Sequence, residues 1–135
     1  MAADAASFLL EVVTPERVVL SRPATFVAFP AFDGEMGVLP NRAPLVAKLG
    51  IGIVRAEGPD GTQRLFVDGG FATMQGETLR LLTEEARLPE AIDPDAVERE
   101  LAAVRSRRLD DDQAFARQQR ALARVRALRA LLNRE

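Results

Sequence analysis

Cysteine and histidine are both absent from this chain of 135 residues. The absence of cysteine excludes disulfides, thiolate metal sites and cysteine nucleophiles. The absence of histidine removes the side chain best suited to proton transfer near neutral pH, and without histidine or cysteine the usual zinc ligands are missing. Catalysis by Ser/His/Asp or Cys/His arrangements is therefore excluded. We expect no cofactor and no metal site.

Tryptophan and tyrosine are missing as well, and no apolar run approaches the roughly 18 residues that a membrane-spanning helix needs. The formal net charge of −2 argues against a nucleic-acid binder, because such domains neutralise phosphates with a large positive excess. The segment Met1 to Ser7 has no basic residue, so it resembles neither a secretory signal nor a transit peptide. We expect a cytoplasmic protein that binds no nucleic acid and meets a membrane only through partners.

Short alternating apolar runs, separated by turn signals, fill the chain up to Thr83. Phe8, Leu10 and Val12 fall on one face of the first run, and later runs are rich in branched or aromatic residues (25–29, 65–67 and 79–83). Glycine-bearing turn signals lie between the runs (33–34, 58–61, 68–70 and 75–76). This pattern favours an all-β sandwich or barrel.

The composition changes at Pro89, after which glycine disappears and helix-forming residues dominate. Asp93-Pro94 predicts the start of one helix, and the acidic run 110–112 predicts the start of a second. Apolar residues follow at helical spacing: Val97, Leu101 and Val104 in the first helix, and Phe115, Leu122, Val125, Leu128 and Leu132 in the second. Two such helices most simply form an antiparallel hairpin.

This hairpin buries little apolar surface by itself, so it needs to lean on the β region or on another protein. At roughly 25 cal/mol per Å² of apolar surface, a two-helix contact offers only a few kcal/mol against a comparable ordering entropy. We therefore expect docked and undocked states of the hairpin to be close in free energy.

Three segments of the β region resemble the epsilon-subunit family of F-type ATP synthases, called delta in mitochondria. They are Val13 to Arg17, the glycine- and proline-bearing run Asp33 to Val46, and Val67 to Phe71. In the second segment Arg42 stands where the family more often has histidine. The resemblance implies an α+β fold. It places an N-terminal antiparallel β-sandwich in residues 1–88, followed by a C-terminal antiparallel two-helix hairpin in residues 89–135.

The function implied by this resemblance is that of a non-catalytic subunit in a rotary central stalk. Such a subunit couples the gamma subunit to the c ring for ion-driven ATP synthesis, and its C-terminal helices inhibit ATP hydrolysis. The implied partners are the gamma subunit, the c ring, and the alpha and beta subunits of the catalytic head. The implied location is peripheral, on the cytoplasmic face of the bacterial inner membrane.

The resemblance also implies a contact to the polar loops of the c ring. Its candidate residues are Glu35, Met36, Gly37 and Arg42, which belong to the glycine- and proline-bearing run. The alternative interpretation is that all four are ordinary turn residues.

A second candidate site lies in the last helix, because the segment from Gln113 to Glu135 contains six arginines and only one acidic residue. Such asymmetry suits an acidic partner. The resemblance implies that this partner is an acidic segment of the beta subunit, with Arg117, Arg120 and Arg124 as the contacts. The alternative is a solvated helix face.

Some members of the family bind ATP through an Ile/Leu-Asp-x-x-Arg-Ala motif. The matching residues here are Ile92, Asp93, Ala96 and Val97, so the arginine that would pair with phosphate is missing. Asp93 is explained as a helix cap. We therefore expect no nucleotide site.

Two other functions remain as alternatives. The carboxylates of Asp33, Glu35 and Asp68 would serve a small acid–base enzyme, although each sits beside glycine as an ordinary turn residue. A free-standing adaptor would bind RNA or anionic lipid through its arginine-rich helix.

Overall fold

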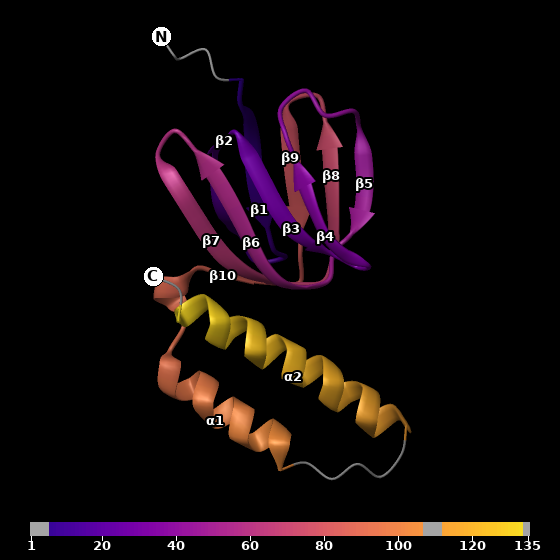
Figure 1. Cartoon of the computed structure of the whole chain (residues 1–135), viewed down its shortest axis with the longest axis vertical. Coiled ribbons are helices and arrows are strands. Elements are labelled where there is room, and N and C mark those ends of the chain that lie inside the picture. The colour runs from indigo at the N-terminus through magenta and orange to yellow at the C-terminus, as the bar shows by residue number, and fades with distance from the viewer. Residues whose placement is uncertain (1–5, 107–111, 134–135) are drawn as a thin grey trace.

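A β-sandwich with a layer of two helices at one end makes up the computed structural model, which describes residues 6–106 and 112–133 (Figure 1). The strands are β1 (Phe8–Val13), β2 (Val18–Ala24), β3 (Phe26–Ala31), β4 (Gly34–Val38), β5 (Leu45–Lys48), β6 (Ile51–Gly58), β7 (Gly61–Asp68), β8 (Phe71–Gln75), β9 (Thr78–Leu82) and β10 (Glu85–Arg87). A 3-10 turn, η2 (Pro89–Ala91), leads into α1 (Pro94–Arg105) and then α2 (Asp112–Leu132). The expected fold class, a β-sandwich followed by a helical hairpin, is confirmed.

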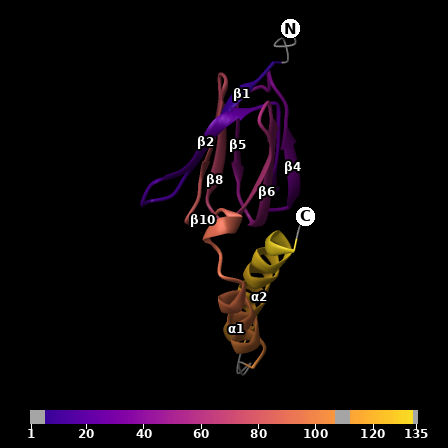
Figure 2. The same cartoon turned by 90° about the vertical axis from the view of Figure 1, so that its left-hand side faces the viewer.

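The strands form two five-stranded sheets, with the orders β2-β1-β9-β8-β5 and β10-β7-β6-β3-β4. Figure 2 shows the two sheets as separate layers. Neighbouring strands are antiparallel except for β1 and β9, which pair in parallel from Leu9↔Thr78 to Val13↔Leu82. These two strands are distant in sequence, so no tight turn forces them to run in opposite directions.

The sandwich core lies between the sheets. Phe8, Leu10 and Val12 are all buried there, as their alternation predicts. The same period applies to β7, where Leu65 and Val67 point into this core.

The helices begin where the sequence predicts. Asp93 is the N-cap of α1, and its side-chain oxygen accepts a hydrogen bond from the backbone N–H of Asp95 at 3.0 Å. The helix α2 begins at Asp112. The other two residues of the predicted acidic start, 110 and 111, lie outside the described residues.

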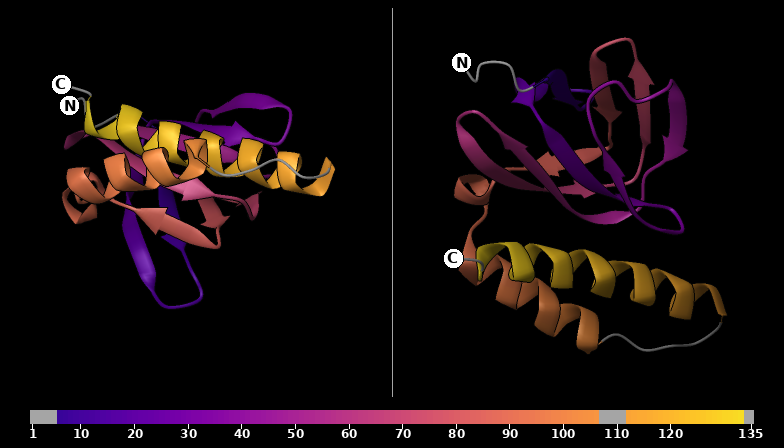
Figure 3. Two further views of the ribbon diagram at one scale, coloured as in Figure 1. Left: turned by 90° about the horizontal axis from the view of Figure 1, so that it is seen from below. Right: turned by 45° about the horizontal axis from the view of Figure 1, so that its top comes forward.

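A second apolar cluster joins the hairpin to the sandwich. Phe66, on the outer face of β7, is fully buried and is the sandwich residue at the centre of this cluster. Ile51 and Ile53 of β6 pack beside it. The connection before α1 contributes Ile92, and the two helices contribute Val97, Leu101, Val104, Val125, Leu128 and Leu131. Figure 3 shows α1 and α2 side by side, running in opposite directions below the sheets.

The prediction that Phe115 continues the apolar stripe of the second helix is wrong, because 51% of this residue is exposed. With 21 residues against 12, α2 is about 13 Å longer than α1 at the usual rise per residue. The first turns of α2 therefore extend past the end of α1, as the right panel of Figure 3 shows. The stripe that packs is formed by Val125, Leu128 and Leu131, with Leu122 and Leu132 half-buried.

The turn between β7 and β8 requires glycine at position 70. Gly70 has φ +106°, and a Cβ at this position would lie 1.9 Å from the backbone oxygen of Leu82. Gly61 has a similar φ of +108°, but nothing lies within 4 Å of the corresponding Cβ position. Backbone strain is therefore common to both sites, and the clash occurs only at Gly70.

We expect Gly70→Ala to lower the free energy of unfolding by about 3 kcal/mol or more, because strain and a backbone clash add at this site. Gly61→Ala is the matched control and should cost only about 1–2 kcal/mol, from strain alone. Urea denaturation followed by circular dichroism measures both values. Equal losses in the two variants would contradict the clash.

Candidate functional sites on the sandwich and the hairpin

Three of the four candidate ring contacts lie on β4, which is an edge strand. The side chains of a strand alternate between its two faces. Glu35 and Gly37 are exposed, whereas Met36 is half-buried, pairs with Phe29 on β3 and packs against the sandwich core. Only Glu35 and Gly37 are therefore open to a partner on the outer face of this strand.

Gly37 has a packing role as well. A Cβ at this position would lie 3.0 Å from Cε1 of Phe26, so the absence of a side chain makes room for that ring. The Arg55 guanidinium carbon lies 5.4 Å from the centroid of the same ring. The Phe26 ring thus fills the space beside Gly37 and lies next to a cation.

Arg42 lies in the connection between β4 and β5 and is exposed. Its neighbour Asn41 has a positive φ of 65°, which bends this connection. Figure 1 shows the connection at the end of the sandwich opposite the hairpin. The structure thus spreads the four candidates along an edge strand and a loop, and does not gather them into one cluster.

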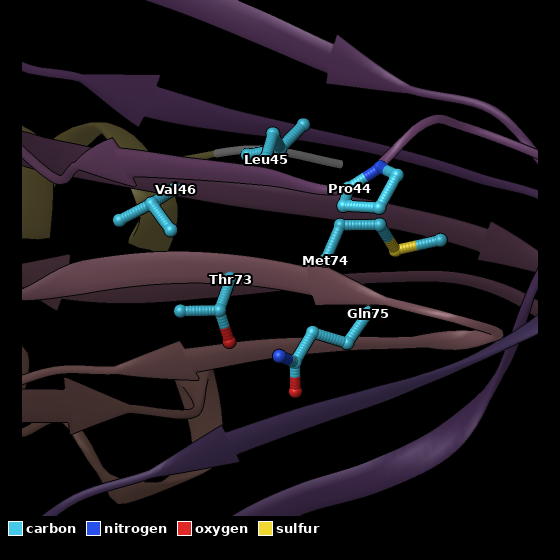
Figure 4. A pocket seen from close by; sticks show the side chains of 6 residues that line it. All are labelled: Pro44, Leu45, Val46, Thr73, Met74 and Gln75. Carbon is cyan, nitrogen blue, oxygen red and sulfur yellow. The ribbon is translucent and has the colours of Figure 1, made fainter.

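A shallow pocket adjoins this loop, between the start of β5 and the end of β8. Figure 4 shows the side chains that line it: Pro44, Leu45, Val46, Thr73, Met74 and Gln75. The lining residues include no charged side chain, so this pocket offers no acid, base or phosphate ligand. The arrangement suits a contact surface better than a reaction centre.

The three candidate arginines of α2 differ in their surroundings. Arg117 and Arg120 are exposed, but Arg124 is half-buried between α2 and the sandwich. The Arg124 guanidinium donates to both carboxylate oxygens of Glu85 on β10, at 2.9 and 2.8 Å from Nη2, and to Glu100 Oε2 on α1 at 2.5 Å from Nη1. Asp68 at the end of β7 lies farther away, with 3.8 Å between its Oδ2 and Nε of Arg124. We call these four residues the Arg124 cluster.

The pKa values in the cluster show which carboxylate is engaged. Burial raises the pKa of Glu85, but hydrogen bonds and charges from Arg124 and Arg87 outweigh burial and leave that pKa below its ordinary value. Burial and the neighbouring Glu85 instead raise the pKa of Asp68, against the lowering effect of Arg124 and Arg120. Glu85 is therefore stabilised as a carboxylate, and Asp68 is the unfavourably placed charge.

Arg124 also lies close to the ring of Phe66, the buried aromatic residue of β7. Its guanidinium carbon lies 5.6 Å from the centroid of the Phe66 ring. Burial lowers the pKa of Arg124, but Glu85 and Glu100 raise it above its ordinary value, so this side chain is a permanent cation.

The residues of the degenerate nucleotide motif have structural positions. Ile92 and Val97 are buried in the second apolar cluster, Ala96 is half-buried, and Asp93 caps α1. These side chains therefore pack or cap at the start of the hairpin.

The carboxylates considered for an enzyme do not converge. Asp68 ends β7 and Glu35 lies on β4, and β6 and β3 lie between them in the sheet. Three strand spacings separate such groups by about 14 Å. In residues 6–106 and 112–133, no group of three potential ligand residues could hold a metal ion.

Glu85 and Glu100 were not among the residues that the sequence singled out. They lie 39 and 24 residues from Arg124 along the chain, so no helical or strand period connects them to it. Only the tertiary fold brings β10, α1 and α2 together at this point.

The sequence is similar to a family of known proteins along most of its length. The model of the ATP synthase Delta/Epsilon chain, beta-sandwich domain, matches residues 7–89. The ATP synthase epsilon chain of Symbiobacterium thermophilum is 39% identical over 133 residues, which cover 93% of this chain and 96% of that protein. The chain belongs to the ATP synthase epsilon chain family.

Other relatives and solved structures agree with this family. The epsilon chain of Rhodopirellula baltica is 46% identical over 91 residues, covering 67% of this chain and 71% of its own length. A chain in the Euglena gracilis mitochondrial ATP synthase, solved with OSCP, F1 and the c-ring, superposes with a TM-score of 0.82 at 26% identity and covers 95% of this chain and 82% of its own. A chain in the Tetrahymena thermophila enzyme shares the fold, with a TM-score of 0.69 at 11% identity, covering 93% and 96%.

Neither described helix of this epsilon-family chain is both long and apolar enough to cross a bilayer.

We expect Arg124→Ala to lower the free energy of unfolding of the hairpin by about 2 kcal/mol, because it leaves Glu85, Glu100 and Asp68 close together without their shared cation. The matched control is Arg129→Ala on the same helix. It breaks only the exposed pair between Arg129 and Glu98, 3.0 Å apart, and should cost about 0.5 kcal/mol or less. Thermal melts of the helical signal measure both variants. Similar losses in the two would show that the Arg124 cluster has no special weight.

Proposed function

We propose that this chain is a non-catalytic central-stalk subunit of an F-type ATP synthase that couples the gamma subunit to the c ring. The supporting observation is the similarity to ATP synthase epsilon chains along nearly the whole sequence, sandwich and hairpin included. Its site of action is the cytoplasmic face of the bacterial inner membrane, which it reaches through its partners.

The chain works as two units, a sandwich of residues 1–88 and a hairpin of residues 89–135. Separate apolar clusters support this division, because one fills the space between the sheets and the other lies between the hairpin and the outer face of β6 and β7. The sandwich carries the contacts to gamma and to the ring. The hairpin carries the contacts to the alpha and beta subunits.

The ring contact lies at the end of the sandwich opposite the hairpin, where the loop bearing Arg42 is exposed (Figure 1). Gly37 continues this surface onto β4, Met36 supports it from the core, and Glu35 lies farther back on the strand, toward the turn between β3 and β4. A permanent positive charge at position 42 suits a polar loop that offers carboxylates or carbonyl oxygens.

The inhibitory contact uses the arginines of α2. Arg117 and Arg120 are exposed at helical spacing and meet an acidic segment of the beta subunit directly. Arg124 joins them when α2 leaves the sandwich. Charge on this helix thereby slows ATP hydrolysis without any catalytic group on the chain itself.

Deletion of the residues after Pro89 should leave a subunit that still assembles, because the sandwich keeps its own core. We expect the assembled enzyme to hydrolyse ATP several-fold faster, since the arginines of α2 are gone. The comparison is the steady-state hydrolysis rate of the enzyme with the full chain. An unchanged rate would remove the inhibitory role while leaving the coupling role intact.

Charge reversal in Arg42→Glu or Glu35→Lys should reduce ATP-driven proton pumping at an unchanged hydrolysis rate, because the contact to the ring weakens. Fluorescence quenching in inverted vesicles measures pumping. The control is Glu16→Lys, an exposed charge in the turn between β1 and β2, which should pump normally. Normal pumping in all three variants would contradict the ring contact.

A further inference from the structure

The Arg124 cluster joins four elements that are far apart in sequence. Arg124 comes from α2, Glu100 from α1, Glu85 from β10 and Asp68 from β7. Glu100 belongs to the hairpin, so its bond to Arg124 orients the arginine within the hairpin. Glu85 belongs to the sandwich, so the three hydrogen bonds that it accepts from Arg124 tie the hairpin to the sandwich.

The apolar part of the same contact is small on the sandwich side. Phe66 is its fully buried member, and Ile51 and Ile53 are only partly buried. None of the three belongs to the core between the sheets. The hairpin can therefore leave without opening the sandwich core, and the bond between Arg124 and Glu85 is a substantial part of what holds it.

The carboxylate of Asp68 limits the strength of this attachment. It lies 3.8 Å from the guanidinium of Arg124, beyond hydrogen-bond distance, and it repels Glu85. Glu84 adds to the negative charge, whereas Arg87 and Arg120 reduce it. Glu85 thus binds Arg124 well, whereas the charge of Asp68 makes the docked hairpin less stable.

We infer that Glu85 and Glu100 form an internal acidic receptor that holds Arg124, and with it α2, against the sandwich, so that an acidic partner can bind this arginine only by displacing the receptor. The receptor is a property of the chain alone. Its competition with the beta subunit rests on the proposed function.

The bond geometry supports a selective receptor. A guanidinium that donates to both oxygens of one carboxylate, and at the same time to a second carboxylate, satisfies the planar fork of arginine in a way that a single contact cannot. An acidic segment that replaces it has to supply comparable carboxylates. Arg117 and Arg120 remain exposed in the docked state and can make the first contact.

The absence of native cysteine allows a direct measurement of docking. Phe66→Cys places one thiol under α2, at a site that is fully buried in the docked state. The rate of thiol labelling then reports how often α2 lifts from β7. This change also removes the ring beneath Arg124, so it is present in every background, and only the differences between second-site variants of the full chain are compared.

We expect Glu85→Gln to accelerate labelling about tenfold, which corresponds to a loss of about 1.4 kcal/mol. Asp68→Asn should leave the rate unchanged or slow it, because it removes the repelling charge. The control is Glu11→Gln, which breaks the exposed 2.8 Å pair with Arg80 on the other sheet and should stay within about twofold. Circular dichroism of each variant verifies that the sandwich remains folded.

An acceleration of more than about threefold in Glu85→Gln over the control supports the receptor, and a smaller one overturns it. Equal acceleration in Asp68→Asn also overturns it, since any lost carboxylate would then loosen the hairpin. Hydrolysis assays on reconstituted enzyme separate the two proposals. Faster labelling together with stronger inhibition supports both, whereas faster labelling with unchanged hydrolysis leaves the receptor standing and removes the inhibitory role.

Discussion

Strand β7, like its neighbour β6, contributes side chains to both apolar clusters, and the attachment of the hairpin depends on this. Leu65 and Val67 point between the sheets, whereas Phe66 points outward and is covered by the hairpin. The strict alternation of side chains along a strand makes this unavoidable. A large aromatic residue on the outer face would expose an apolar surface to water unless another element covered it, and the hairpin is that element.

The apolar contact and the Arg124 cluster have complementary roles at this junction. Burial of Phe66 is non-directional and favours any arrangement that covers the ring. The bonds from Arg124 to Glu85 and Glu100 are directional, so they select one position of α2 over β7 and one pairing of the two helices. Such a junction is specific without being large. This property suits the proposed departure of α2 from the sandwich.

The candidate site residues form two groups. The exposure of some follows from their local sequence, whereas that of others depends on contacts with residues far away in the chain. The exposure of Glu35, Arg42, Arg117 and Arg120 is consistent with their place in a polar edge strand, a turn-rich loop and a charged helix face. Met36 and Arg124 differ, because each is drawn partly inward by groups that lie elsewhere in the chain. Phe115 differs in the opposite direction, because helical spacing predicts that it packs and the structure leaves it exposed. The helix α1 is too short to cover it.

Period, turn residues and the composition change at Pro89 determined the all-β region, the hairpin, the cap at Asp93 and the buried face of β1, and the choice of a sandwich over a barrel came from the family resemblance. These features follow from neighbours along the chain, and local geometry is enough to specify them. Tertiary structure alone decided the parallel pairing of β1 with β9, the covering of Phe66 and the capture of Arg124 by Glu85 and Glu100. These contacts join residues 24 or more positions apart, where no sequence period carries information about which groups will meet.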